Sequence, residues 1–299
     1  MQAVGHWPDL AARLLSETGI DVGLTQKGGL YLSRSPETFA QRARDLATVK
    51  SRFPGDYHFD MLDNAEIRKR VPHIGPEVVG GSYSPYDGQA NPLRLLHALH
   101  RAYLQRRGRV LSTGGVSDIA VKDGKYILET AAGQVVARRI VLAAGLGNAH
   151  LGAMLGAEIP VKPVRGQILV TERMPPMFDI AIEQVRQTED GTLMIGGSWE
   201  EVGLDVATTF DVTRRIAEDA LHFFPALKAV RVMRSWAALR IITPDAAPIY
   251  EEVAPGAFLV TCHSGVSLAA VHMRDTAGWI AEGAIPAAMS DFDRRRFLL

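Results

Sequence analysis

The residues best suited to chemistry are concentrated between positions 235 and 270. This stretch holds Arg240 between apolar neighbours, a Thr-Pro-Asp turn at 243–245, and an apolar run at 257–260. The run is short enough for a buried strand, and the β-branched residues at its end favour a sheet. A polar segment that contains a glycine, at 263–265, then leads into a long apolar helix.

A strand that ends in such a turn and leads into a helix directs free backbone N–H groups toward one point, which suits an anion or an electron-rich ring. Arg240 precedes this turn by a short loop, and a guanidinium group is a two-pronged donor for a carboxylate. We therefore predict a site for a flat, partly anionic cofactor beside a substrate that carries a carboxylate.

Other interpretations of these residues stay open. A buried arginine must be paired, so Arg240 equally suits a structural ion pair, and the same question applies to Arg165 and Arg186. His263 and Ser264 lack the G-x-S-x-G elbow of a serine hydrolase, which favours a polar loop at a helix start.

A cysteine and a pair of histidines give weaker indications of a functional site. Cys262 ends an apolar strand, where an inert buried thiol is expected. His97 and His100 share a helix face without a third ligand, so no metal site is predicted.

Composition excludes several classes of protein. The 299 residues contain 33 basic and 33 acidic side chains, and a nucleic-acid-binding protein would carry a basic excess. The single cysteine excludes a disulfide framework and fits a reducing compartment. No apolar run has the length of a membrane span, and the first residues do not have the pattern of a signal peptide. We expect a cytoplasmic protein without an integral membrane segment.

The expected elements alternate between helices and strands. Periodicity and capping residues predict helices at 7–18, 35–50, 64–72, 91–107, 211–224 and 270–282, with Asn64, Asn91 and Asp211 as caps. Strands are expected in a meander over 109–139, in an apolar parallel strand at 139–144, and in a hairpin around Asp190-Gly191. This mixture indicates an α/β plus α+β fold with two domains that the chain enters more than once.

Gly145 and Gly147 follow the apolar strand as in a dinucleotide-binding fingerprint. His150 stands where that fingerprint has its third glycine, and no acidic residue follows at the right distance. We expect a secondary backbone contact to a nucleotide that is held mainly elsewhere.

Six segments, taken in order, resemble one known family. They are GGSYSPYDGQANPLRLLHAL, RRIVLAAGLGNAHLGAMLG, PVKPVRGQILVTE, RQTEDGTLMIGGSWEEVGLD, LRIITPDAAPIY and CHSGVSLAAVHMRDTAGWIAEG. The sequence resembles the D-amino acid oxidase/glycine oxidase family of FAD-dependent oxidoreductases. The sequence around Arg186 and Cys262 is most similar to that of flavin subunits of multi-subunit members, such as opine or D-hydroxyproline dehydrogenase and hydrogen cyanide synthase.

The resemblance implies an enzyme that oxidises a C–N bond of an amino acid or secondary amine by hydride transfer to flavin, with FAD as cofactor. It implies that Arg240 holds the substrate carboxylate and that no general base is needed. The cofactor-binding residues that it implies are Val116, Ala143, Ala144, Gly145, Ser264, Gly265, Val266 and Ser267. The implied partners are a small amino-acid or imino-acid substrate and other subunits of a multi-subunit dehydrogenase.

The resemblance also implies a domain division. Residues 1–24, 93–158 and 239–299 are expected in an FAD-binding domain, and residues 25–92 and 159–238 in a substrate-binding domain with an antiparallel sheet. Members of the family begin with a βαβ unit, and Met1 corresponds to a position after that unit. The FAD-binding domain is therefore expected to be incomplete. The rival hypothesis is a truncated, non-catalytic relative that holds no FAD and acts only as a partner-binding subunit.

Overall fold

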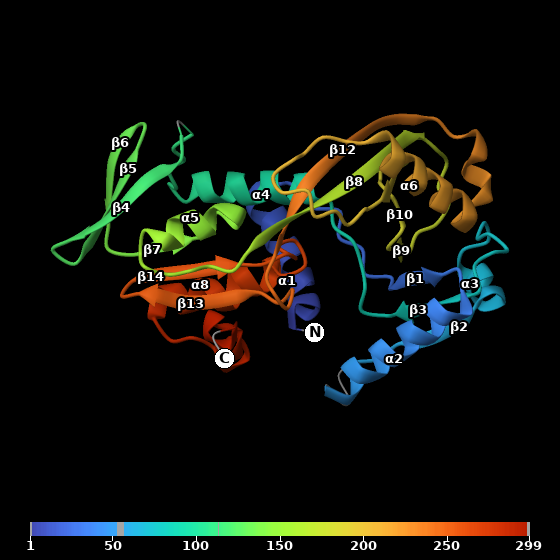
Figure 1. Ribbon diagram of the computed structural model, residues 1–299, viewed down its shortest axis with the longest axis horizontal. Helices are drawn as coiled ribbons and strands as arrows, with labels where there is room; N and C mark the ends of the chain where they lie inside the picture. Colours follow the sequence, from blue (N-terminus) through green and yellow to red (C-terminus); the bar gives the residue numbers. More distant parts are fainter. Residues whose placement is uncertain (1, 53–56, 113, 298–299) are drawn as a thin grey trace. The chain divides into compact units, whose positions relative to one another are not determined.

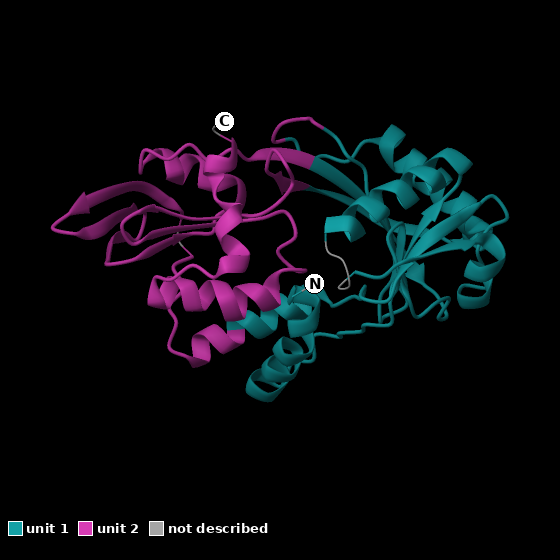
Figure 2. Ribbon diagram, turned by 90° about the horizontal axis from the view of Figure 1, so that it is seen from below, with its two compact units in different colours: residues 1–100, 165–200, 205–238 teal, residues 101–164, 201–204, 239–299 magenta. Residues whose placement is uncertain are grey.

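The computed structural model describes residues 2–52, 57–112 and 114–297. The chain forms two compact units, each assembled from separate segments (Figure 2). Unit 1 contains residues 1–100, 165–200 and 205–238, and unit 2 contains residues 101–164, 201–204 and 239–299. The chain therefore leaves and re-enters each unit, as the mixed pattern of strands and helices predicts.

Unit 1 contains two four-stranded sheets. The first has the order β2-β3-β1-β9, with β1 antiparallel to β3 and parallel to β9. The second has the order β10-β11-β8-β12, and its long strands β8 and β12 each run from one unit into the other. The strands are β1 (Gly29–Ser33), β2 (Asp60–Asp63), β3 (Gly80–Ser84), β8 (Lys162–Arg173), β9 (Ala181–Ile182), β10 (Val185–Gln187), β11 (Thr192–Gly196) and β12 (Val232–Ile242).

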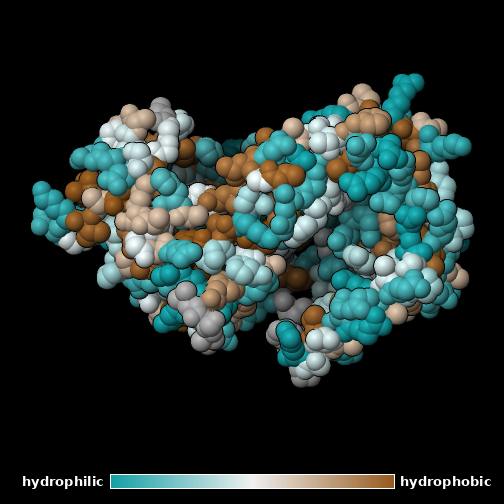
Figure 3. Space-filling view, in the orientation of Figure 1, coloured by the Kyte–Doolittle hydropathy of each residue, from teal (hydrophilic) through white to brown (hydrophobic). Residues whose placement is uncertain are grey.

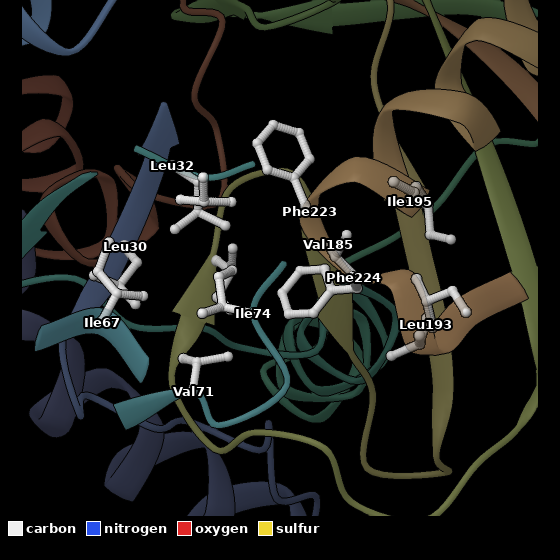
Figure 4. Close-up of a cluster of buried hydrophobic side chains, with 14 of the residues drawn as sticks. Leu30, Leu32, Ile67, Val71, Ile74, Val185, Leu193, Ile195, Phe223 and Phe224 are labelled. Atoms are coloured by element: carbon white, nitrogen blue, oxygen red, sulfur yellow. The ribbon is translucent and has the colours of Figure 1, made fainter. Parts of the chain in front are cut away.

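Five helices accompany these sheets (Figure 1). They are α1 (Gln2–Thr18), α2 (Pro36–Arg52), α3 (Asn64–Arg70), α6 (Phe210–Phe223) and α4 (Pro92–Gln105), whose last turn lies in unit 2. Figure 4 shows the core of unit 1, where Leu30 and Leu32 of β1 lie with Leu193 of β11 and Phe224 after α6. The core thus joins both sheets of the unit.

Unit 2 is built on a three-stranded sheet with the order β13-β14-β7, whose strands are Ile249–Ala254, Ala257–Thr261 and Ile140–Leu142. The expected parallel strand at 139–144 is confirmed, because β7 pairs in parallel with β14. A separate antiparallel meander consists of β4 (Val116–Lys122), β5 (Lys125–Thr130) and β6 (Gly133–Ala137).

The helical segments of unit 2 are short. A 3-10 turn at Gly145–Gly147 leads into α5 (Asn148–Ala153). The expected helix at 270–282 is formed by α7 (Ala269–Val271), a π-helical turn at His272–Thr276, and α8 (Ala277–Glu282). Further 3-10 turns lie at Pro225–Ala229 in unit 1, and at Ala287–Phe292 and Arg294–Phe297 in unit 2.

Several expected boundaries need correction. Asp63 rather than Asn64 caps α3, through a capping box with Glu66. Thr209 rather than Asp211 lies at the cap position of α6. Residues 109–112 are not a strand, because strand formation requires a pairing partner, and the meander begins at Val116.

The expected domain division stays a prediction, and the compact units divide the chain at other positions. Residues 1–24 and 93–100, which we expected beside the FAD-binding segments, group with unit 1, and residues 159–164 and 201–204 group with unit 2. Within unit 1, Gln26 Nε2 donates a hydrogen bond to the carbonyl of Val4 in α1.

Across the described ranges, no helix is both long and apolar enough to span a bilayer.

Candidate cofactor and substrate site

The site predicted from the sequence begins where β7 and β14 end. The two strands are parallel, with Leu142 paired to Leu259, so their carboxyl ends lie at the same edge of the sheet. Ala143 and Ala144 follow β7, and the segment from Cys262 to Leu268 follows β14. Ligands of open α/β sheets bind outside the carboxyl ends of parallel strands. Two of the predicted cofactor-binding segments therefore emerge at one edge of unit 2.

Asn148 connects these two strand ends. Its buried side chain accepts a hydrogen bond from the backbone N–H of Ala144 at 2.8 Å. Its Nδ2 donates to the carbonyl of Val260 at 3.5 Å. One amide thus fixes the turn after β7 against β14. Asn148 was not predicted as a site residue, although a polar residue in the GLGN turn indicates a side chain that caps local backbone groups.

The segment from His263 to Ser267 is an exposed turn that leads into α7. The amide of Leu268 donates to the carbonyl of Ser264 at 3.0 Å, and the amide of Ala269 donates to that of Val266 at 3.1 Å. The turn is therefore held by its own backbone while its outer surface stays open. A turn between a strand and a helix was expected here, and the assignment of Ser264, Gly265, Val266 and Ser267 to the cofactor stays a prediction.

The turn after β7 lies beside the end of β12. Gly145 has a φ of +62°, which favours glycine, and a Cβ added there would lie 3.3 Å from Cδ1 of Ile241. Arg240 precedes Ile241 in β12 and is half-buried. Because side chains alternate along a strand, Arg240 extends from the face opposite Ile241. The residue next to Arg240 in β12 therefore directs its side chain toward Gly145.

Val116, the last of the predicted cofactor-binding residues, lies in the separate meander sheet. It begins β4 and packs, partly buried, against the core that includes Ile140 and Leu142 of β7. Val116 therefore packs against the core that supports β7, but it belongs neither to the segment after β7 nor to the segment after β14.

The strand-end residues fit a flat anionic group. The hydroxyl of Thr261, the last residue of β14, is buried and has no hydrogen-bond partner among the described residues. A Cβ added at Gly265 would approach only Cys262 Sγ, at 4.0 Å, so this surface is open. The segment 262–268 contains no acidic side chain. A buried orphan hydroxyl, an open backbone turn and the lack of negative charge together suit FAD.

Near this turn lies a group of titratable side chains, of which Tyr250 is buried and Cys262 and His272 are half-buried. Tyr250 Oη and His272 Nε2 are 2.9 Å apart. Burial raises the pKa of the Tyr250 hydroxyl, and the nearby Cys262 adds to this effect. Burial also raises the pKa of the Cys262 thiol and lowers the pKa of His272. These groups are therefore uncharged at neutral pH, so they do not oppose an anion above them. This environment accords with the expected inert thiol.

The other two arginines belong to unit 1. Arg165 is buried and donates to Glu200 at 2.7 Å, while Gln167 and Ser198 also donate to that carboxylate. Burial alone would raise the pKa of Glu200, but these hydrogen bonds outweigh it and lower the pKa to about 2. Arg165 is thus a structural ion pair, the alternative that the sequence left open.

Arg186 is fixed by unit 1 in a different way. Its Nε donates to Gln89 at 3.0 Å and its Nη2 donates to the carbonyl of Ala90 at 2.9 Å. Burial lowers the pKa of its guanidinium group. In the ranges 2–52, 57–112 and 114–297, no three His, Cys, Asp or Glu side chains are grouped as a metal site would require.

Comparison with known proteins defines the class of this chain. Residues 2–279 match the family described as FAD dependent oxidoreductase. The chain belongs to this family, so it is an FAD-dependent oxidoreductase, and FAD is its cofactor.

Two named relatives are similar in sequence to this chain over most of its length. An opine oxidase subunit from Agrobacterium tumefaciens (strain Ach5) is 41% identical over 295 residues, which cover 98% of this chain and 80% of that protein. The hydrogen cyanide synthase subunit HcnC of Pseudomonas aeruginosa is 30% identical over 262 residues, which cover 85% of this chain and 62% of that protein. The family resemblance stated from the sequence is confirmed.

A solved structure confirms the mixed α/β fold. Glycine oxidase from Geobacillus kaustophilus superposes with a TM-score of 0.88 at 24% identity, covering 98% of this chain and 80% of that one. About a fifth of that structure thus has no counterpart in these 299 residues.

Proposed function

We propose that this chain is the flavin-bearing subunit of an enzyme that oxidises a C–N bond in an amino acid or secondary amine. The observation that carries the proposal is the junction of two strand ends at Asn148, which brings the turn after β7 and the turn after β14 to one sheet edge. The 41% identity with the opine oxidase subunit supports this substrate class. Because that relative and HcnC are named as subunits, we also propose that partner subunits assemble with this chain.

In this proposal the residues of unit 2 hold the cofactor and orient the substrate. The backbone of Ala143, Ala144 and Gly145 would hold the dinucleotide, with Val116 on its adenine side. The turn from Ser264 to Ser267 would hold the flavin ring, because backbone amides at a helix start stabilise negative charge. When bound, FAD supplies the acceptor for the hydride that leaves the substrate α-carbon.

Arg240 fixes the substrate in the proposed mechanism. Its guanidinium group binds the substrate carboxylate through two parallel hydrogen bonds, which orients the α-carbon. The substrate nitrogen releases a proton to water as the C–N bond becomes an imine, and water then hydrolyses the imine to a carbonyl compound and an amine. No side chain is required as a general base.

The visible absorption spectrum of the purified chain tests this proposal. The chain is desalted after incubation with FAD, and the retained flavin is then mixed anaerobically with amino acids and opines. We expect a retained flavin band that bleaches with substrate. A folded protein that retains no flavin, alone or with partner polypeptides, would contradict the proposal and favour the non-catalytic relative.

A pair of matched variants locates the cofactor. Val266→Asp places a carboxylate on the turn proposed to adjoin the flavin, so we expect at least a ten-fold loss in FAD affinity. Val136→Asp places the same charge on exposed β6, and we expect FAD affinity to stay unchanged. Equal affinities of the two variants would contradict the assignment of the turn.

A further inference from the structure

The turn that follows β12 has an unusual backbone conformation. β12 ends at Ile242, two residues after Arg240, and the amide of Ala246 then donates to the carbonyl of Thr243 at 3.0 Å. Ala246 has a φ of +59°, a left-handed conformation that residues other than glycine rarely adopt. A backbone of this kind persists only where surrounding contacts hold it. The turn at 243–247 therefore depends on the side chains that bind it.

Two side chains of the turn hold it from within. Oδ1 of Asp245 accepts a hydrogen bond from the amide of Ala247 at 3.0 Å. The hydroxyl of Thr243, which is buried, donates to the carbonyl of Ala247 at 2.7 Å. Thr243 and Asp245 thus fix both backbone groups of Ala247, and they do so only while the Asp245 carboxylate keeps its orientation.

Arg296 binds the same turn from a distant part of the chain. Its Nε donates to Oδ2 of Asp245 at 2.8 Å, and its Nη2 donates to Oδ1 at 3.0 Å. This is the two-pronged pairing that a guanidinium group makes with a carboxylate. Nη2 also donates to the carbonyls of Ala247 at 3.3 Å and Pro248 at 3.0 Å. One side chain therefore holds both the carboxylate of the turn and the backbone that follows it.

The segment that carries Arg296 is itself fixed. Nη1 of Arg296 donates to the carbonyl of Asp293 at 2.8 Å, and its Cζ lies 4.2 Å from the centroid of the Phe297 ring. In the same 3-10 turn, Nε of Arg294 pairs with Oε2 of Glu251 in β13 at 3.1 Å. These contacts dock the segment on β13 and keep Arg296 directed at the turn after β12.

Water reaches the pair of Arg296 and Asp245. The side chain of Arg296 is 19% exposed and that of Asp245 is 42% exposed. Figure 3 shows hydrophilic and apolar residues interspersed over the surface where Figure 1 draws β13 and α8. An ion pair in contact with water contributes little to the stability of a fold. The main effect of Arg296 is thus to orient the turn, and a chain without this side chain should still fold.

We propose that Arg296 is a positioning residue for Arg240: it holds the turn at 243–247 and thereby fixes the end of β12. Arg240 lies two residues before the end of this strand, and its neighbour Ile241 directs its side chain toward Gly145. A shift of the strand end would therefore move Arg240 relative to the segment after β7. Small displacements of a group that orients the substrate weaken its action strongly.

This positioning role deepens the proposed function and rests on it in one respect, the binding of the substrate carboxylate by Arg240. The hold of Arg296 on the turn does not depend on FAD or substrate, because every contact that makes it lies within unit 2. The hold on the turn and its effect on the substrate can therefore be measured separately.

Hydrogen exchange in the full 299-residue chain without FAD tests the hold on the turn. Arg296→Ala should speed exchange of the amides at 246 and 247 about ten-fold, because the turn then opens locally. Arg294→Ala is the matched control: it removes the ion pair with Glu251 from the same segment and should leave these amides unchanged. Equal exchange in Arg296→Ala and the unaltered chain would overturn the proposal.

A second variant approaches the pair from the other side. Asp245→Asn removes the charge that Arg296 binds but keeps an acceptor for the amide of Ala247. It should speed exchange in the same direction, and thermal unfolding verifies that each variant folds. Unchanged exchange in a folded Asp245→Asn chain would likewise overturn the proposal.

Steady-state kinetics of the flavin-loaded chain test the connection to Arg240. Arg296→Ala should raise KM for an amino acid or opine about ten-fold and change kcat little, the pattern of lost substrate binding. Arg294→Ala should leave both values unchanged. With an amine analogue that lacks the carboxylate, Arg296→Ala should keep the KM of the unaltered chain. Equal losses with both substrates would show general damage and overturn the positioning role.

Arg240→Ala separates this inference from the proposed function. Faster exchange in Arg296→Ala, with KM raised in both variants, supports both. Faster exchange with KM raised by Arg240→Ala but not by Arg296→Ala would overturn the positioning role and leave the proposed function intact. Faster exchange with no effect of Arg240→Ala on KM would contradict the proposed function and leave the hold of Arg296 on β12 intact.

Discussion

Val141 and Phe258 are paired across neighbouring parallel strands, yet Phe258 is 2% exposed and Val141 is 44% exposed. The aromatic ring packs against Trp279, whereas Val141 is not part of the hydrophobic cluster that Phe258 and Trp279 form. The apolar face of the central sheet of unit 2 is thus only partly covered by the residues that the structure describes.

This difference predicts unequal costs of truncation. Phe258→Ala should lower the free energy of unfolding by about 3–5 kcal/mol, the usual cost of removing a buried aromatic ring. Val141→Ala in the same chain should cost less than about 1 kcal/mol, because water already contacts this side chain. Urea denaturation followed by circular dichroism measures both values. Similar losses would mean that Val141 is buried in the folded chain.

Asn148 should couple stability to cofactor binding. Asn148→Asp keeps an acceptor for the amide of Ala144 but replaces the donor to Val260 by an oxygen, so we expect a loss of about 1–3 kcal/mol in stability. We also expect roughly ten-fold weaker FAD binding, equivalent to about 1.4 kcal/mol, in a fluorescence titration. His150→Ala, an exposed change on the same helix, is the control. A variant that loses stability but keeps full FAD affinity would remove Asn148 from the site.

Arg240 should act on substrate affinity alone. Arg240→Ala should raise KM for a carboxylate substrate about 10- to 100-fold, as expected from losing charged hydrogen bonds worth about 1.5–3 kcal/mol. The flavin spectrum should stay unchanged. Arg234→Ala, an exposed change on β12, should leave KM unaltered. An equal loss with a substrate analogue that lacks the carboxylate would exclude the clamp.

The ion pair of Arg165 and Glu200 predicts a pH dependence of stability. The pKa of Glu200 in the folded chain, about 2, lies below the ordinary value of 4.5. Its stabilisation is therefore complete above pH 4.5 and is lost as pH falls toward 2, because the unfolded chain binds the proton first. Glu200→Gln should cost about 3–5 kcal/mol at pH 6 and progressively less at pH 4 and 3.

Urea midpoints at the three pH values measure this convergence. Glu201→Gln, which removes the exposed pair with Lys162, should cost less than about 1 kcal/mol at each pH. A constant difference between Glu200→Gln and the unaltered chain from pH 6 to pH 3 would show that Glu200 does not titrate in this way.

The sequence predicted those helices and turns that are determined by residues only a few positions apart. Asn91 caps α4 by accepting hydrogen bonds from the amides of Leu93 and Arg94, and Pro92 begins the helix, as predicted. The Asp190-Gly191 turn joins β10 to β11, again as predicted. A capping side chain and a turn glycine act within a few residues, so the sequence alone is sufficient.

Features that depend on distant residues were missed. Val110 and Leu111 have the composition of a strand, but a strand forms only where another strand pairs with it. The role of Asn148 depends on Val260, 112 residues later in the chain. The cap of α3 is a different case, because the Asp63 and Glu66 spacing of a capping box was readable and was overlooked.

The pairing of β7 with β14 also has a consequence for synthesis of the protein. Residues 140–142 leave the ribosome long before residues 257–261, their partners in the sheet. At ordinary translation rates this interval lasts on the order of ten seconds, during which both edges of the apolar segment lack a strand. The β13-β14-β7 sheet of unit 2 therefore cannot form completely until residue 261 has been translated, and nascent chains that stall before residue 257 would be substrates for chaperones and proteases.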